Sequence, residues 1–417
     1  MKETDRLPSF RHLKMFEIVA QTQSVNRASE LINLSQPAIS QAIANIEARF
    51  GVSLFERRHD GSYLTPFGRI LLDRTQRLFT LVRQGLADLF AGSQFAETAD
   101  LASVIGKITP THIRCLVAIS ESTSFDEAAR RIGVSQPSLH RAARELEKLC
   151  RRALYARGPR GISTTRQGSD LARCLKLAMQ ELDYACEDIN VQKGIVISKI
   201  SVGALATLGS FVIARAINDF LRDYPAARVQ VIEAPYEQLL SDLRQGNIDF
   251  LFGVLRRPEW ATDVREQLLF REPYVIVARP GHPLMKSRDS SRDDLAKYDW
   301  IVPGPTTPRY LAFQRLFAST KNKPQVTIET ASRSLVRSIL TMSDRLTILP
   351  RHEAFSEKRL GVLGTVRTRV RLPNRSYGVA TRVSWQPTAL QQTFQGMLIL
   401  HGHRVATADP ADGKVKA

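Results

Sequence analysis

Side chains that form hydrogen bonds gather on one face of residues 35–50, a segment with a helical pattern. The opposite face is apolar at three- and four-residue steps, as in a helix that packs on one side only. Amides, hydroxyls and a guanidinium group in such an array can read base edges in the DNA major groove. An ordinary solvated helix has the same pattern, so spacing alone leaves both interpretations open. The polar residues are Gln36, Ser40, Gln41, Asn45 and Arg49, and the apolar residues are Ile39, Ile43, Ile46 and Phe50.

The neighbouring elements would position this face. Residues 24–34 predict a shorter helix and a tight turn. Ser35 is then a candidate N-cap, with Pro37 in the first turn of the second helix, where the missing N–H of proline has no intrahelical acceptor to lose. A short hairpin follows, with Arg57 and Arg58 near its turn. Two helices joined by a tight turn and followed by a basic hairpin predict a winged helix-turn-helix.

The motifs SQPAISQAI, FGVSLFER and LTPFG follow one another within residues 35–68. Together they resemble the N-terminal domain of LysR-type transcriptional regulators. The resemblance implies a DNA-binding domain followed by a long linker helix that pairs with its copy in a dimer. The residues of this domain that we expect to contact DNA are Gln36, Pro37, Ser40, Gln41, Arg57 and Arg58.

The same motif set recurs after a shift of 100 residues, without a gap, so that Ser135-Gln136-Pro137 repeats Ser35-Gln36-Pro37. Such a register indicates a second copy of the winged unit, whereas most members of the resembled family carry one. The second copy is more basic, which favours phosphate contacts and guanine recognition through arginine. A degenerate copy retained for packing is the alternative, since Arg151 replaces Gly51. The residues expected to contact DNA are Gln136, Ser138, His140, Arg141, Arg157 and Arg160.

A long helix with an apolar face follows each copy, over residues 69–91 and 166–189. In the resembled family the first position holds the dimer-forming linker helix, and a helix folded back on its own domain is the alternative. The second helix directly precedes the next domain, which makes it the better candidate for dimerisation. We therefore expect a homodimer or homotetramer, in keeping with the two-fold symmetry of many DNA targets.

From residue 195 the pattern changes to alternating strands and helices, which predicts a parallel doubly wound sheet. The segments LLSDLRQGNIDF, EPYVIVARPGHPL and LTILPR resemble the effector-binding domain of the same regulators, a two-lobed fold related to periplasmic solute-binding proteins. The expected fold class is therefore multidomain: two α-rich winged helix-turn-helix domains plus a two-lobed α/β effector domain.

Two loops that lead from a strand into a helix predict the ligand site, because helix N-termini attract anions. Their candidate residues are Thr207, Thr306, Thr307 and Arg309. Threonine hydroxyls that only cap their own helices are the alternative. We expect a small-molecule effector that is anionic or related to sugars. The sugar-related effector is inferred from the segment WIVPGPTTPR, which resembles the sequence of a family subgroup that includes regulators of a sugar-binding protein.

Composition limits the remaining functions. The 43% of hydrophobic and 24% of charged residues are typical of a soluble globular protein. The net charge of +18 favours an anionic partner, but residues 1–100 hold 12 basic and 11 acidic groups, so the excess lies elsewhere. No apolar run approaches the length of a bilayer-spanning helix, the N-terminus lacks an apolar export core, and we expect a cytoplasmic protein without a membrane partner. The four cysteines and eight histidines show no metal-ligand or nucleophile spacing, so we expect no metal, cofactor or enzymatic activity.

The sequence thus predicts a sequence-specific, double-stranded-DNA-binding transcriptional regulator controlled by a small-molecule effector. The alternative is a small-molecule-binding protein whose second winged domain is structural and does not bind DNA. The expected domains are a first winged helix-turn-helix (8–67), helix and linker (68–107), second winged helix-turn-helix (108–167), linker helix (168–194), two-lobed effector domain (195–405) and tail (406–417).

Overall fold

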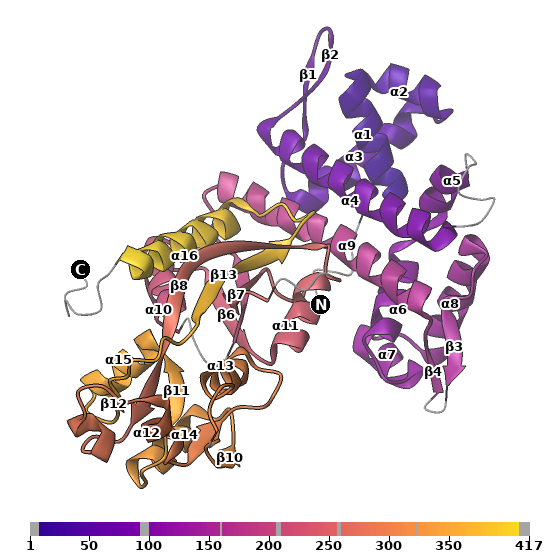
Figure 1. Ribbon diagram of the computed structural model, residues 1–417. Helices are drawn as coiled ribbons and strands as arrows, with labels where there is room; N and C mark the ends of the chain where they lie inside the picture. Colours follow the sequence, from indigo (N-terminus) through magenta and orange to yellow (C-terminus); the bar gives the residue numbers. More distant parts are fainter. Residues whose placement is uncertain are drawn as a thin grey trace. The chain divides into compact units, whose positions relative to one another are not determined.

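The protein is described by a computed structural model that covers residues 8–91, 100–158, 161–205, 210–256, 260–321 and 323–407 (Figure 1). The chain divides into two compact units, Met1–Ser198 and Lys199–Ala417. Within the described ranges, none of the helices combines the length and the apolar character that a membrane span needs.

Three helices and a hairpin open the first unit, and we call them head 1. They are α1 (Phe10–Thr22), α2 (Val25–Ile32), α3 (Gln36–Phe50), β1 (Phe55–Arg58) and β2 (Gly61–Leu64). Ser24 begins α2, because its hydroxyl accepts a hydrogen bond from the Arg27 N–H at 3.3 Å. Asn33 ends α2 in the left-handed conformation and starts the tight turn into α3. Apolar side chains of the three helices then pack into one core.

The same order of elements returns as head 2, after the short helix α5 (Asp100–Lys107). Its elements are α6 (Pro110–Ser120), α7 (Phe125–Ile132), α8 (Gln136–Cys150), β3 (Tyr155–Gly158) and β4 (Gly161–Thr164). Burial along residues 131–150 repeats burial along residues 31–50 at every position except the pair 40 and 140. The shift of 100 residues therefore relates positions with the same environment in three dimensions.

Both heads use the same polar contact to join the third helix to the hairpin. In head 1 the Glu47 carboxylate accepts a hydrogen bond from the Leu54 N–H at 2.7 Å. In head 2 the Glu147 carboxylate accepts the equivalent bond from the Leu154 N–H at 2.9 Å. A half-buried carboxylate that holds a backbone N–H fixes where the hairpin leaves the helix.

Backbone conformations at the helix ends also repeat. Gly51 and Arg151 both end the third helix with positive φ, at 62° and 48°. The left-handed region disfavours an arginine by about 1–2 kcal/mol, yet head 2 retains the turn. At the start of the next helix, a Cβ atom on Gly68 or Gly168 would lie 2.2 Å from the carbonyl oxygen of the hairpin-entry leucine. The replacement of Gly51 in the second copy therefore does not change the fold there.

Two long helices, α4 (Pro66–Phe90) and α9 (Arg166–Gln192), join the heads into one unit. They run antiparallel, because Arg74 contacts Asp188 whereas Gly85 faces Cys174. Buried apolar residues of both heads and both helices form one continuous cluster. We expected α4 to pair with a second chain or with its own domain, and α9 to form a dimer. In the structure α4 pairs with α9 inside one chain, and the homodimer or homotetramer stays a prediction.

The second unit contains a seven-stranded mixed sheet. Strands β5 (Lys199–Ala204), β6 (Arg228–Glu233) and β7 (Phe250–Val254) are parallel, with α10 (Ser210–Asp223) and α11 (Tyr236–Arg244) between them in sequence. β13 (Asn374–Arg382) runs antiparallel between β7 and β8 (Val264–Ala278), and β11 (Thr347–Pro350) and β12 (Gly364–Thr365) pair with β8. A purely parallel sheet was therefore the wrong expectation. The reason is that β8 and β13 cross between the two parts of the unit in opposite directions (Figure 1).

The second unit also contains a separate two-stranded parallel sheet. β9 (Trp300–Val302) pairs with β10 (Val326–Glu329), and Trp300 is fully buried with its indole N–H donating to the Leu295 carbonyl at 3.1 Å. The remaining elements are η3 (Pro283–Lys286), α12 (Arg292–Ala296), α13 (Pro308–Leu316), α14 (Arg333–Thr341), α15 (Arg351–Arg359) and α16 (Ala389–Thr407).

Candidate nucleic-acid interface and effector site

The predicted reading face of α3 is solvent-accessible. Gln36, Pro37 and Gln41 are exposed and Ser40 is half-buried, while Ile39 beneath them is fully buried. The Gln41 amide donates to the Asn45 side chain at 3.0 Å, which orients both amides along the helix surface. An exposed row of amides on a helix anchored by its other side is the geometry that reads base edges.

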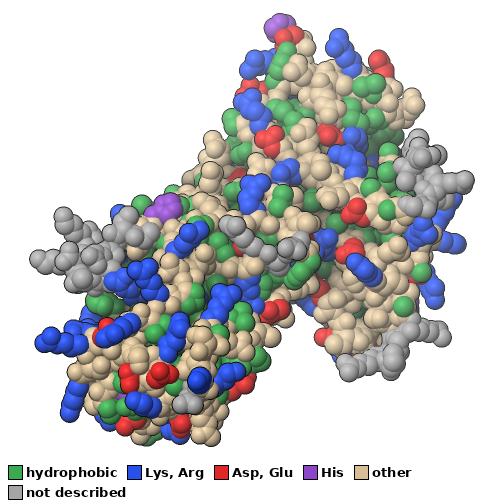
Figure 2. All heavy atoms as spheres, in the orientation of Figure 1, with side chains coloured by type: hydrophobic (Ala, Val, Ile, Leu, Met, Phe, Trp, Pro, Cys, Tyr) green, Lys and Arg blue, Asp and Glu red, His purple; other side chains and the backbone are tan. Residues whose placement is uncertain are grey.

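The β1–β2 hairpin carries the basic residues expected in the wing. Arg57 and Arg58 are exposed, and Figure 2 shows blue side chains close to the tip of this hairpin, beside a purple and a red one. Arg58 pairs with Glu56 at 3.1 Å and lies 5.1 Å from the centroid of the Tyr63 ring. These contacts hold the Arg58 guanidinium near the strand pair. A DNA phosphate would compete with the exposed Glu56 carboxylate for this guanidinium.

The equivalent face of α8 has different chemistry. Gln136, Ser138, His140 and Arg141 are all exposed. The His140 ring stacks on Phe125 with centroids 4.4 Å apart, which positions the imidazole at the helix surface. Imidazole and guanidinium groups thus replace the hydroxyl and amide that α3 carries at the same two positions.

Part of the predicted second wing and of the predicted effector loops lies outside the described residues. Arg160 and Thr207 belong to this group, and nothing is described of the Arg157 side chain. Among the described candidates, Thr306 is exposed. The Thr307 hydroxyl donates to the Gly304 carbonyl at 2.8 Å and accepts from the Tyr310 N–H at 3.3 Å. Thr307 therefore caps its own helix, as in the alternative interpretation.

Arg309 lies in a different environment from the threonines. It is 6% exposed and lines a cavity of about 210 Å³. Burial lowers its pKa, although the nearby Glu353 opposes this effect. Its guanidinium forms no hydrogen bond or ion pair at bonding distance with the described part of the chain. A buried cation without such a partner is costly and is characteristic of functional sites.

A cluster on β8 and β13 lies next to Arg309, and sequence reasoning missed it. The Arg375 guanidinium lies 4.9 Å from the centroid of the Tyr274 ring and 5.4 Å from that of Tyr377. Both tyrosine hydroxyls and the Arg375 Nε are buried without a hydrogen-bond partner among the described atoms. Burial raises the pKa of Tyr274 to about 12, so its hydroxyl stays protonated and able to donate. Two cations and two O–H donors, groups that can bind an anion, are thus buried close together, and Arg309 is the member of this set that lines the cavity.

Carboxylates that line the same cavity balance part of this charge. Glu353 forms an ion pair with Arg333 at 2.8 Å, and Glu357 forms one with Arg337. Burial raises the pKa of Glu353, against the opposing charges of Arg333 and Arg309. The cavity is lined by Arg309, Arg333, Ser334, Val336, Arg337, Leu349, Glu353, Glu357 and Leu363. Its mixture of paired and unpaired charges is suited to binding a small charged molecule.

The described residues hold no group of histidine, cysteine, aspartate or glutamate side chains arranged to bind a metal ion. Burial raises the pKa of Cys115 to about 11 and that of Cys150 to about 12. Both thiols are therefore protonated at neutral pH, which makes them poor nucleophiles.

Comparisons with known proteins match both units. Residues 10–69 and 110–169 match the family described as bacterial regulatory helix-turn-helix protein, lysR family, and residues 196–400 match the LysR substrate binding domain. The HTH-type transcriptional regulator GalR of Pseudomonas putida is 31% identical over 358 residues, which are 86% of this chain and 88% of GalR. The HTH-type transcriptional regulator PcaQ of Agrobacterium fabrum is 25% identical over 73% of this chain and 97% of PcaQ.

Among solved structures, full-length OxyR from Pseudomonas aeruginosa has a similar fold, with a TM-score of 0.53 and 20% sequence identity. The similarity covers 72% of this chain and 96% of that chain. More than a quarter of the present chain lies outside the matches to PcaQ and OxyR, although both of those proteins are matched almost completely.

Proposed function

The chain belongs to the LysR family of bacterial transcriptional regulators, and we propose that it contacts DNA through two heads. The usual pattern of the family has one such head per chain. The family predicted from the motifs is confirmed. So is the function: the protein is a transcriptional regulator with a helix-turn-helix DNA-binding domain and an effector-binding domain.

Preservation of the DNA-facing surface in head 2 supports the proposal of two DNA-contacting heads. Third-helix positions 36, 37, 38 and 41 are exposed in head 1, as are their counterparts 136, 137, 138 and 141 in head 2, and the equivalent glutamate fixes the hairpin in each head. A packing role alone would not explain an exposed row of hydrogen-bonding side chains in head 2. The row in head 2 nevertheless consists of Gln136, Ser138, His140 and Arg141.

The two heads are suited to different contacts. In head 1 we assign base reading to Gln36, Ser40 and Gln41, with Pro37 at the helix start and Arg57 and Arg58 on phosphates. In head 2 we assign the phosphate and guanine contacts to the residues predicted there, including Arg157 and Arg160.

Charge reversal on α8 tests whether head 2 binds DNA. The variant Arg141→Glu with Arg144→Glu changes two exposed cations, and Lys358→Glu is a matched control in the second unit. We expect lower affinity for bound genomic fragments and a salt dependence reduced by about two in slope, one for each lost phosphate contact. Unchanged affinity and slope would show that head 2 is structural and does not bind DNA, which is the alternative function.

For the effector we propose a small organic anion bound at the buried arginines. The observation that carries this proposal is Arg309, a buried cation beside a cavity and without an ion pair in the described structure. Arg375 and the hydroxyls of Tyr274 and Tyr377 supply further donors. Thr306, Thr307 and Thr207 remain predicted contributors from the adjoining loops.

Calorimetric titration of the full chain with small carboxylates, sulfate and neutral sugars tests this site. We expect an anion to bind, and Arg309→Gln and Arg375→Gln each to weaken it by about tenfold or more, the usual loss for a buried charge-assisted bond. The exposed Arg292→Gln is the control. Binding of a sugar that both variants retain would favour the sugar-related effector instead.

A further inference from the structure

The contacts between α4 and α9 are reciprocal under the shift of 100 residues. Arg74 contacts Asp188 at 2.7 Å, which joins position 74 of the first copy to position 88 of the second. Burial raises the pKa of the Cys174 thiol, and the nearby charge of Asp88 adds to this effect. Asp88 is position 88 of the first copy and Cys174 is position 74 of the second, so the same two positions meet again with the copies exchanged. Such reciprocity is the mark of an interface with two-fold symmetry. The chain therefore holds an internal pair of heads arranged like the two halves of a dimer.

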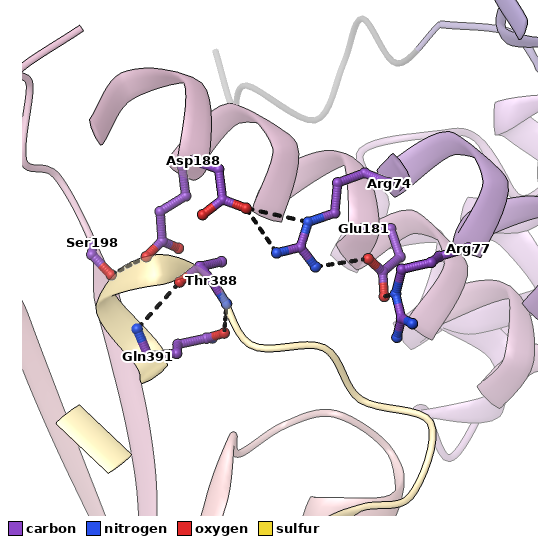
Figure 3. A network of polar contacts seen from close by, with 8 residues as sticks. Arg74, Arg77, Glu181, Asp188, Ser198, Thr388 and Gln391 are labelled. Atoms are coloured by element: carbon purple, nitrogen blue, oxygen red, sulfur yellow. Dashed lines mark hydrogen bonds and ion pairs between the residues drawn. The ribbon is translucent and has the colours of Figure 1, made fainter. Parts of the chain in front are cut away.

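The two ends of this helix pair differ in charge. Arg74 donates to Glu181 at 3.0 Å as well as to Asp188, and Arg77 lies 3.4 Å from Glu181 (Figure 3). The Arg74 and Glu181 side chains are 5% and 4% exposed. Burial opposes the charge of Arg74, but the hydrogen bonds and charges of both carboxylates raise its pKa overall. The buried ion pair occurs at one end only, because the equivalent positions hold Cys174 and Leu81.

This asymmetry disfavours pairing between identical helices. In a pair of two α9 helices, each Glu181 would face Cys174 and would be buried without a cation. In a pair of two α4 helices, Arg74 would keep a carboxylate, because Asp88 is equivalent to Asp188, but it would face Leu81 in place of Glu181. A pair of two α9 helices would bury a carboxylate without a cation, and a pair of two α4 helices would lose one of the two carboxylates around Arg74. The side chains therefore favour the pair of α4 with α9.

From these contacts we propose that one chain is a preassembled, unlike pair of heads that reads a bipartite duplex DNA with two different half-sites. The proposal rests on the proposed function, in which both heads contact DNA. The continuous core of the first unit fixes the heads relative to each other. The approximate two-fold relation places the half-sites in inverted order, and the difference between α3 and α8 makes them unequal in sequence.

Selection of randomised duplex DNA by the full chain tests the sequence asymmetry. We expect an enriched motif with two dissimilar halves, one lost in Gln41→Ala and the other in Arg141→Ala, with Lys358→Ala as the unchanged control. An inverted repeat of a single half-sequence would overturn the proposal while leaving DNA contact by both heads intact. A single half-site that ignores Arg141→Ala would instead refute DNA binding by head 2, and the pair with it.

Spacing between the halves tests whether the heads form a fixed pair. Insertion of about five base pairs, roughly half a helical turn, moves one half-site to the opposite side of the duplex. We expect affinity to fall to that of a single half-site, a loss of about a hundredfold or more when two linked contacts become one. Affinity that is independent of spacing would show two flexibly tethered heads and would overturn the proposal.

Discussion

A Cβ atom on Gly85 of α4 would lie 2.6 Å from the Cβ atom of Cys174 on α9, closer than real Cβ contacts allow. Glycine in a helix interior is less favourable than alanine by about 1 kcal/mol, so its presence at this position has another cause. The absent side chain lets the two helix backbones approach and seal the core between the heads.

The first prediction concerns this close contact. Gly85→Ala should lower the free energy of unfolding of the first unit by about 1–3 kcal/mol, because overpacking outweighs the gain in helix propensity. Thermal unfolding followed by circular dichroism measures the change. Gly106→Ala in α5 is the matched control: no atom lies within 4 Å of the new Cβ, and stability should rise by up to about 1 kcal/mol. An equal rise in both variants would contradict the close packing of α4 against α9.

The second prediction concerns the pH dependence of anion binding. Burial raises the pKa of Glu353, so its carboxylate gains a proton at milder acidity than an exposed glutamate. Protonation removes a negative charge next to Arg309, Arg333 and Arg375, and affinity for sulfate should therefore increase as pH falls. Calorimetry between about pH 8 and 5 measures this increase, since sulfate keeps its charge over that range.

Glu353→Gln mimics the protonated form and should bind sulfate more tightly at neutral pH, with a weaker pH dependence. Glu357 lines the same cavity, and His352 pairs with Glu272 at 2.8 Å. His352→Asn should therefore keep the pH dependence. If the dependence disappears in His352→Asn and persists in Glu353→Gln, the assignment to Glu353 is wrong.

The third prediction separates positioning from reading in head 1. Arg57→Ala and Arg58→Ala should each weaken binding to all DNA sequences and lower the salt slope by about one. Gln41→Ala should weaken binding only to the specific site, by about 1–3 kcal/mol. Fluorescence anisotropy at several salt concentrations distinguishes the two effects. Equal losses on specific and random DNA in Gln41→Ala would remove it from the reading face.

The fourth prediction concerns the thiols. With pKa values of about 11 and 12, Cys115 and Cys150 are almost entirely protonated at pH 7.5. Iodoacetamide should label them slowly in the folded protein and rapidly after denaturation, as mass spectrometry of peptides can show. Fast labelling of either residue in the folded protein would contradict the burial and protonation assigned to its thiol.

Much of the head architecture could be predicted because its signals are local. A serine or threonine cap, a proline or glycine in the first turn and an apolar period set most of the helix bounds, and the expected helix 166–189 is observed as Arg166–Gln192. The pairing of α4 with α9 has no local signal. Arg74 and Glu181 are 107 residues apart, and an apolar stripe does not reveal which other stripe it will contact.

The effector cluster shows the same limit. Arg309 follows a strand and begins a helix, so its loop could be recognised. Arg375 and Tyr377 reach the cluster from β13, and the antiparallel register that sets Tyr377 opposite Phe270 of β8 is a long-range property. The available signal was a single arginine near the start of an otherwise largely buried strand.

Covalent linkage of α3 and α8 also affects how operators diverge. In a symmetric regulator, one codon change alters both ends of the recognised site at once, and both ends must drift together. In the proposed unlike pair each end is encoded separately, so one could mutate while the other holds the protein in place. Such a site also has a direction, which would orient the bound regulator toward one of two flanking genes.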